Sequence, residues 1–215
     1  MLRLALPVVT AEIGWMAMGV VDTLMVGRVG AEALGAVSIG RALFMLVAVC
    51  GIGLLLGLDT LVSQAFGAGE PGTCRRAAVH GVYLAVLISL PLTLSVRLLG
   101  QSMPYAGVNE GVTELALPYI RAVSWSALPV FLYSALRRYL QAMNQVRAVM
   151  FVLISANAVN FCANWLLIYG NWGAPALGAE GAGWATFAST LFLALSLLLL
   201  AAAEARRHPR VLAAV

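Results

Sequence analysis

The sequence predicts an all-α membrane protein with six transmembrane helices, and three observations lead to this fold class. Of the 215 residues, 62% are hydrophobic and only 10% are charged, whereas a soluble domain carries about a quarter charged residues. The mean hydropathy of +0.93 is correspondingly high. The chain also contains six predominantly apolar runs of roughly the 20 residues with which a helix crosses a bilayer.

The six predicted spans are separated by short connections in which glycine, proline and charged residues interrupt the apolar pattern. The fourth span is the weakest, because Arg121, Arg137 and Arg138 leave it only a short uncharged centre. A loop is predicted over 67–76, and residues 204–215 form a basic tail. The spans cover about 4–26, 34–65, 77–96, 114–140, 148–169 and 181–203.

The distribution of arginine predicts the topology. Six spans place both termini on one side, and arginine accumulates in cytoplasmic segments. With cytoplasmic termini, nine of the thirteen arginines fall in inner segments, and Arg28, Arg41, Arg97 and Arg121 fall at outer ends. The inner nine are Arg3, Arg75, Arg76, Arg137, Arg138, Arg147, Arg206, Arg207 and Arg210.

Several classes of function are excluded by what the sequence contains. The net charge of +4 does not indicate a nucleic-acid partner, because topology accounts for arginines at the ends of apolar runs. The sequence has no zinc-ligand spacing, phosphate-binding glycine loop, dinucleotide fingerprint or nucleophile elbow. We therefore predict neither an enzyme nor a protein with a cofactor.

A polar cluster is predicted in the outer half of the bundle. Asp22 is a carboxylate within an apolar run, where a charge costs about 2.5–3.5 kcal/mol and therefore usually has a task. Asp22, Asn164 and Thr186 lie five or six residues from the outer ends of their spans, about 8 Å deep at 1.5 Å per residue. Asn157 and Asn160 share a helix face with Asn164.

The predicted cluster joins Asp22 to Asn160, Asn164 and Thr186, and its oxygens suit either a proton or Na⁺. The alternative is that the asparagines only connect helices by hydrogen bonds. Glu12, Asn157 and Gln64 are further candidates for lining a lumen, although Gln64 equally suits an interfacial position.

Four segments resemble the MATE (multidrug and toxic-compound extrusion) family, in the branch of the NorM-like transporters. Pro7 and VVDTLMVGRVGAEALGAVS resemble its first-helix signature, and GLDTLVSQAFGAGEPG resembles the end of its second helix. LRRYLQAMNQVRAVM resembles the junction of its fourth and fifth helices. NAVNFCANWLLIYGNWGAPALGAEGAGWAT resembles its fifth and sixth helices.

This resemblance implies an antiporter that uses H⁺ or Na⁺ to export small cationic, amphipathic compounds. It implies that Asp22 is the first-helix residue that binds the coupling ion, with Na⁺ as one candidate. It further implies that Asn160 and Asn164 are the fifth-helix polar pair and Thr186 a sixth-helix partner. Tyr119 corresponds to a fourth-helix tyrosine near this cluster.

Family members have twelve helices in two lobes, and this chain resembles only the amino-terminal lobe. Residues 204–215 then form the cytoplasmic tail or the start of an inter-lobe linker. The expected partners are membrane lipid, small cationic substrates, and a second six-helix lobe or another copy. The expected location is the bacterial inner membrane, with several spans and both termini cytoplasmic.

Two other functions remain open. One is a flippase for lipid-linked oligosaccharides from the same superfamily, which would need a strongly basic lumen. The predicted spans place no arginine or lysine near their centres, which argues against it. The other is a half-length fragment that does not transport.

Overall fold

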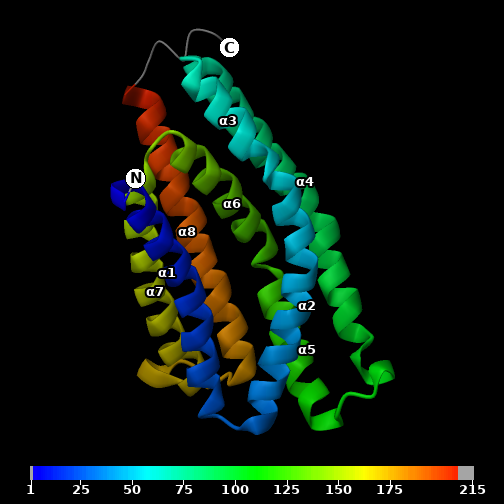
Figure 1. Cartoon of the computed structure of the whole chain (residues 1–215). Coiled ribbons are helices and arrows are strands. Elements are labelled where there is room, and N and C mark those ends of the chain that lie inside the picture. The colour runs from blue at the N-terminus through cyan, green and yellow to red at the C-terminus, as the bar shows by residue number, and fades with distance from the viewer. Residues whose placement is uncertain (1, 208–215) are drawn as a thin grey trace.

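The structure, a computed structural model, describes residues 2–207, and every regular element in that range is a helix (Figure 1). The predicted all-α fold class is therefore confirmed. Most of the predicted tail, 208–215, lies outside the described residues. The α-helices are α1 (Leu2–Gly27), α2 (Ala31–Leu55), α3 (Gly57–Gly67), α4 (Pro71–Gln101), α5 (Glu110–Ser124), α6 (Ala127–Ala142), α7 (Val146–Tyr169) and α8 (Ala179–Arg207). Two 3₁₀ helices are η1 (Met103–Ala106) and η2 (Asn171–Gly173).

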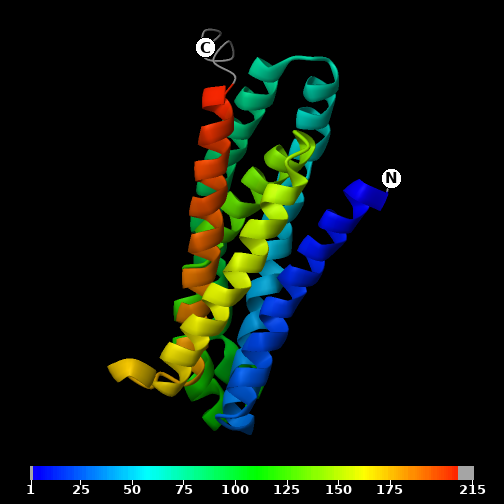
Figure 2. The same cartoon turned by 90° about the vertical axis from the view of Figure 1, so that its left-hand side faces the viewer.

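The helices form two groups that α8 connects. One group contains α1, α7 and α8, and the other contains α2 to α6 (Figure 1). Helix α8 packs against α5 and α6 as well as α7. The described chain begins and ends at the same end of the bundle, which we call the termini end. In Figure 2, α1, α7 and α8 converge towards the opposite end.

Two of the predicted spans are interrupted helices. The second consists of α2 and α3, which meet at Leu56 through i→i−3 hydrogen bonds. The fourth consists of α5 and α6, which are bent by 44° at Trp125–Ser126. Pro129 lacks the N–H that would bond the Trp125 carbonyl, so the regular ladder ends there. The described residues contain five helices apolar and long enough to cross a membrane, or six if this bent pair is one span.

All six spans begin two to six residues earlier than expected from the sequence, and two of these starts have a local cause. Helix α4 begins at Pro71, so the loop expected over 67–76 ends six residues early. Proline suits the first helical position, because its fixed φ is helical and its missing N–H is not needed there. Helix α2 begins at Ala31, where the Leu34 N–H bonds the Gly30 carbonyl over 3.1 Å, rather than at residue 34.

The surface and the interior of the bundle differ as a membrane protein requires. Large apolar side chains on the outside, such as Leu87 and Leu90 of α4, are 71% and 74% exposed. A continuous surface of this kind suits hydrocarbon better than water. Inside, glycine allows helices to approach closely: the ring of Phe131 lies 2.6 Å from where a Cβ on Gly51 would be.

We expect Gly51→Leu to destabilise the protein, because its side chain would overlap Phe131 and Leu92. Overpacking a filled interior costs about 1–3 kcal/mol. Thermal unfolding of the detergent-solubilised chain, followed by circular dichroism, would measure this as a lower melting temperature. Gly53→Leu is the matched control, since a Cβ at Gly53 meets no atom within 4 Å. Equal melting temperatures for the two variants would contradict the packing described here.

Candidate functional site

The structure brings together Asp22, Asn160, Asn164 and Thr186, from α1, α7 and α8. The Asp22 carboxylate accepts hydrogen bonds from Asn160 Nδ2 at 3.0 Å and from Asn164 Nδ2 at 2.5 Å. The Thr186 hydroxyl lies 3.4 Å from Asp22 Oδ2 and makes a shorter bond, 2.9 Å, to the Ala182 carbonyl of its own helix. Asp22 is only 7% exposed, and both asparagines are fully buried.

The helical repeat explains why two asparagines reach one carboxylate. Asn160 and Asn164 are four residues apart on α7, so they lie on one face of that helix, and Asn164 Nδ2 also donates to Asn160 Oδ1 at 3.1 Å. Asn164 Oδ1 is buried and has no hydrogen-bond partner among the described residues. A buried acceptor without a partner is rare enough in folded proteins to need an explanation. It leaves the cluster with capacity to bind one more positive group.

A cavity of about 40 Å³ lies beside this cluster, between α1, α2, α5, α6 and α8. Asp22, Thr186 and Tyr119 line it, together with apolar side chains such as Phe44. Tyr119 fits there because Gly40 has no side chain: a Cβ on Gly40 would lie 2.5 Å from the tyrosine ring. A cavity of this volume holds about one water molecule or a small ion. We call it the Asp22 cavity.

Arg41 also lines the Asp22 cavity, although it was not among the site residues expected from the sequence. It was expected at the outer end of its span, but α2 begins at Ala31, so Arg41 lies about 15 Å along the helix. A Cβ on Gly19 would overlap the Arg41 guanidinium, which therefore packs against the backbone of α1. The signal that could have located Arg41 was the glycine and acidic residue, Gly30 and Glu32, at the start of α2.

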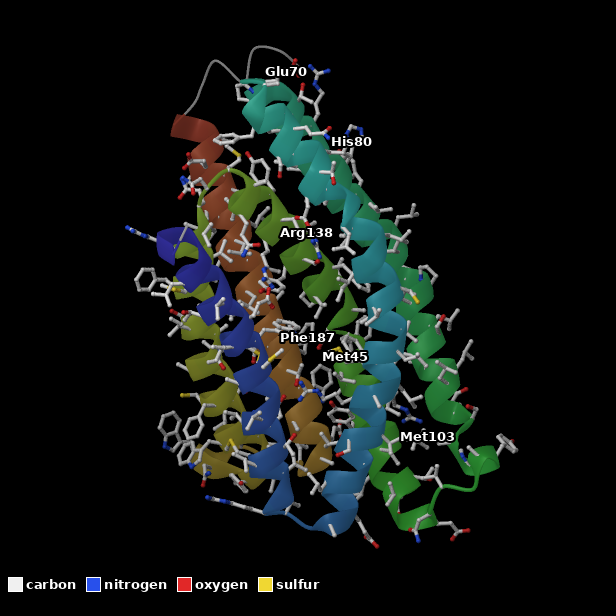
Figure 3. The ribbon with its side chains drawn as sticks, viewed as in Figure 1. Met45, Glu70, His80, Met103, Arg138 and Phe187 are labelled. Atoms are coloured by element: carbon white, nitrogen blue, oxygen red, sulfur yellow. The ribbon has the colours of Figure 1, made fainter. Side chains whose placement is uncertain are left out.

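A second cavity, of about 410 Å³, lies nearer to the termini end and contains two ion pairs. Arg137 pairs with Glu12 and Arg138 pairs with Asp59, which joins α6 to α1 and to α3. Figure 3 places Arg138 nearer to the termini end than Met45, which lines both cavities. We call this space the ion-pair cavity.

The two cavities are neighbours in one crevice between α1, α2 and α6. Trp15 and Val130 line both of them, as Met45 does. The indole of Trp15 stacks on the Tyr133 ring, with 5.3 Å between ring centroids and 9° between planes. The crevice thus has polar groups in both cavities, with apolar and aromatic side chains between them.

The remaining candidates have different surroundings. Glu12 lines the ion-pair cavity. The amide of Asn157 donates to the carbonyls of Gly14 on α1 and Leu153 on α7, each at 2.9 Å, so it connects those two helices. Gln64 is exposed on α3 and lines neither cavity.

Comparison with known proteins gives consistent matches in sequence. The family model described as MatE matches residues 7–166. A probable multidrug resistance protein NorM of Geobacillus kaustophilus is 37% identical over 203 residues, which cover 89% of this chain and 44% of that protein. Its counterpart in Synechocystis is 32% identical over 197 residues, covering 92% of this chain and 43% of that protein.

The fold is similar to solved transporter structures. The crystal structure of the eukaryotic MATE transporter AtDTX14 superimposes with a TM-score of 0.85 at 21% identity, over 94% of this chain and 44% of that one. The predicted fold of one lobe from a two-lobe transporter is therefore confirmed. The chain spans less than half the length of the curated relatives it matches.

We expect Glu12 and Arg137 to be energetically coupled. Glu12→Gln, Arg137→Gln and the double variant form a cycle, and chemical unfolding of the solubilised chain would measure the free energy of each. Because either single variant leaves a charge without its partner, the coupling should be about 0.5–3 kcal/mol. In a control cycle, Glu12→Gln should add to Arg97→Gln, since Arg97 bonds Ser124 instead. Additivity in both cycles would mean that the Glu12–Arg137 pair does not stabilise the fold.

Proposed function

The chain belongs to the MatE family, and from this membership we propose that it is the amino-terminal lobe of an ion-coupled multidrug efflux transporter. Members of this family are transporters, and the two relatives described above carry the name of multidrug resistance proteins. The proposed substrates are small amphipathic compounds with a positive charge. The proposed location is the bacterial inner membrane with cytoplasmic termini, for which the arginine distribution is the support.

The observation that carries this proposal is a buried carboxylate whose hydrogen-bond partners are neutral. Asp22 is bonded by Asn160 and Asn164, and neither amide cancels its charge. The unpartnered Asn164 Oδ1 and the Thr186 hydroxyl are further oxygens in the cluster. A proton on Asp22 needs no further ligand, while Na⁺ would use these oxygens. The coupling ion is therefore H⁺ or Na⁺.

Ion binding at Asp22 would change the contacts of α1. The hydrogen bonds from α7 to Asp22 favour a charged carboxylate, and a bound ion or proton competes with them. Occupied and empty states then favour different positions of α1 relative to α7 and α8. A ligand shifts a conformational equilibrium by its difference in affinity for the two states, and this difference is the coupling that an antiporter requires.

The other wall of the transport pathway would come from a second lobe or another copy. In transporters built from repeats, the substrate lies at the interface of the repeats. We assign the crevice between α1, α2 and α6, which contains both cavities, to this interface. Lipid would cover the apolar outer faces, such as that of α4.

The flippase alternative finds less support in the site. Arg41 lies about 15 Å along α2 and lines the Asp22 cavity, but it shares this cavity with the carboxylate of Asp22. The ion-pair cavity likewise has two acidic and two basic residues. Neither cavity is strongly basic, which a pyrophosphate-bearing lipid would require. A half-length chain without transport activity is the other alternative, and reconstitution of the chain by itself would test it.

We expect Asp22→Asn to abolish ion-coupled efflux. The complete transporter that contains this lobe would be reconstituted in vesicles, and export of a fluorescent cation would be measured under an imposed pH or Na⁺ gradient. Loss of a bond between the ion and a carboxylate should reduce coupled export about tenfold or more. Glu32→Gln is the matched control, since Glu32 is exposed in the first turn of α2. Unchanged export and ion dependence in Asp22→Asn would refute the assignment of Asp22.

A further inference from the structure

We propose that a groove on the outside of the bundle, between α1 and α7, binds one phospholipid. The phosphate of this lipid contacts Arg28, and one acyl chain lies along the groove. We call the site the α1–α7 groove. Its walls are Val21 and Leu24 of α1 and Phe161 and Trp165 of α7, and Arg28 and Tyr169 lie at one end.

The first observation is the shape of the groove and its place on the molecule. It has a volume of about 290 Å³ and shares no lining residue with the Asp22 cavity or the ion-pair cavity. From Phe161 to Tyr169 it follows α7 for about 12 Å, at 1.5 Å per residue. Leu24 and Phe161 are 66% and 53% exposed, so the groove opens away from the bundle. A long apolar groove on a membrane-facing surface suits an acyl chain.

The second observation is that Arg28 is the one charged residue among those that line the groove. Its side chain makes no hydrogen bond, ion pair or cation–π contact with any residue in the described range 2–207. Arg28 directly follows Gly27, the last residue of α1, where the membrane-spanning helix gives way to the headgroup region. A guanidinium binds a phosphate through two parallel hydrogen bonds. The fitting partner of Arg28 is therefore an anionic group at headgroup depth.

Aromatic side chains indicate the same depth for this end of the groove. Tryptophan and tyrosine are enriched where a membrane meets water, because their rings are apolar and carry one polar group. The ring of Trp165 meets that of Trp172 edge-on, with 5.4 Å between centroids. Trp172 is 90% exposed, and the segment after α7 projects from the side of the bundle near the end opposite the termini (Figure 2). The acyl chain then runs from Arg28 towards Phe161, into the membrane.

Hydrogen bonds hold the Arg28 end of the groove in place. The Met25 carbonyl accepts bonds from the Tyr169 hydroxyl at 2.8 Å and from the Arg28 backbone N–H at 3.3 Å. These bonds join the end of α1 to the end of α7, so the site is formed before a lipid binds. On the buried side of the same two helices, Asp22 is bonded by two asparagines of α7. A lipid in contact with both walls therefore stabilises the α1–α7 pair from the membrane side.

The test compares two lipids that differ in the phosphate. Phosphatidylglycerol and a diacylglycerol, each with the same photoreactive acyl chain, would be added to the purified chain in an uncharged detergent. Peptide mass spectrometry then measures the labelling of α1 and α7 relative to that of α4. We expect Arg28→Gln to reduce labelling by phosphatidylglycerol about fivefold, the effect of one arginine on an anionic lipid, and to leave labelling by diacylglycerol unchanged.

A second variant tests the acyl-chain part of the site. Val21→Phe fills the groove without removing Arg28, so labelling of α1 and α7 by both lipids should fall. Two variants serve as matched controls. Arg121→Gln removes an exposed arginine of α5 that does not line the groove, and Leu87→Phe enlarges an exposed side chain on α4. Both controls should be labelled on α1 and α7 as the unmodified chain is.

Three outcomes would refute the inference. Equal labelling of the unmodified chain by the two lipids would show that the groove does not recognise a phosphate. An equal loss in Arg28→Gln and Arg121→Gln would mean that the lipid responds only to the surface charge. Unchanged labelling in Val21→Phe would place the acyl chain elsewhere. Each of these results is independent of ion-coupled efflux, because the groove shares no residue with the Asp22 cavity.

Discussion

Asp22 accepts hydrogen bonds from Asn160 and Asn164. The arrangement of helices at the end of the bundle opposite the termini depends on these bonds. A carboxylate at membrane depth has no water to solvate it, so other helices must supply its partners. Two amide donors on successive turns of α7 do so, and α8 contributes Thr186. The helices α1, α7 and α8 converge at the end opposite the termini, as these contacts require (Figure 2).

The same constraint explains how much the sequence could predict. Apolar length and arginine distribution define helices and their order, and equal depth then brings Asp22, Asn164 and Thr186 to one level. Contacts between these residues are expected because polar side chains inside a membrane protein form hydrogen bonds with one another across helices. The helical class and this meeting of residues were therefore accessible without a structure.

What could not be predicted depends on helix starts and on pairs between distant segments. Helix α2 begins three residues earlier than expected, so Arg41 lies about 4.5 Å further along the helix than the sequence indicated, at 1.5 Å per residue. The ion pairs of Glu12 and Asp59 join α6 to α1 and α3, which are distant in the sequence, and hydropathy does not predict such pairs. Asn157 lies on the same helix face as Asn160, yet its amide donates to the backbone carbonyls of Gly14 on α1 and Leu153 on α7 and does not reach Asp22.

The three acidic residues that face the crevice differ in their hydrogen-bond partners. This difference distinguishes the two that stabilise the fold from the one proposed to bind the coupling ion. Glu12 and Asp59 are half-exposed and each has an arginine partner, so removing their charge would leave a largely buried guanidinium without its carboxylate, which is unfavourable. Asp22 accepts hydrogen bonds from neutral amides. When Asp22 binds a proton or an ion, no arginine therefore loses a directly contacting carboxylate. Of the three, Asp22 alone can change its charge state without breaking an ion pair that ties α6 to its neighbours. Ion binding at Asp22, as proposed, would therefore leave the ion pairs of the ion-pair cavity intact.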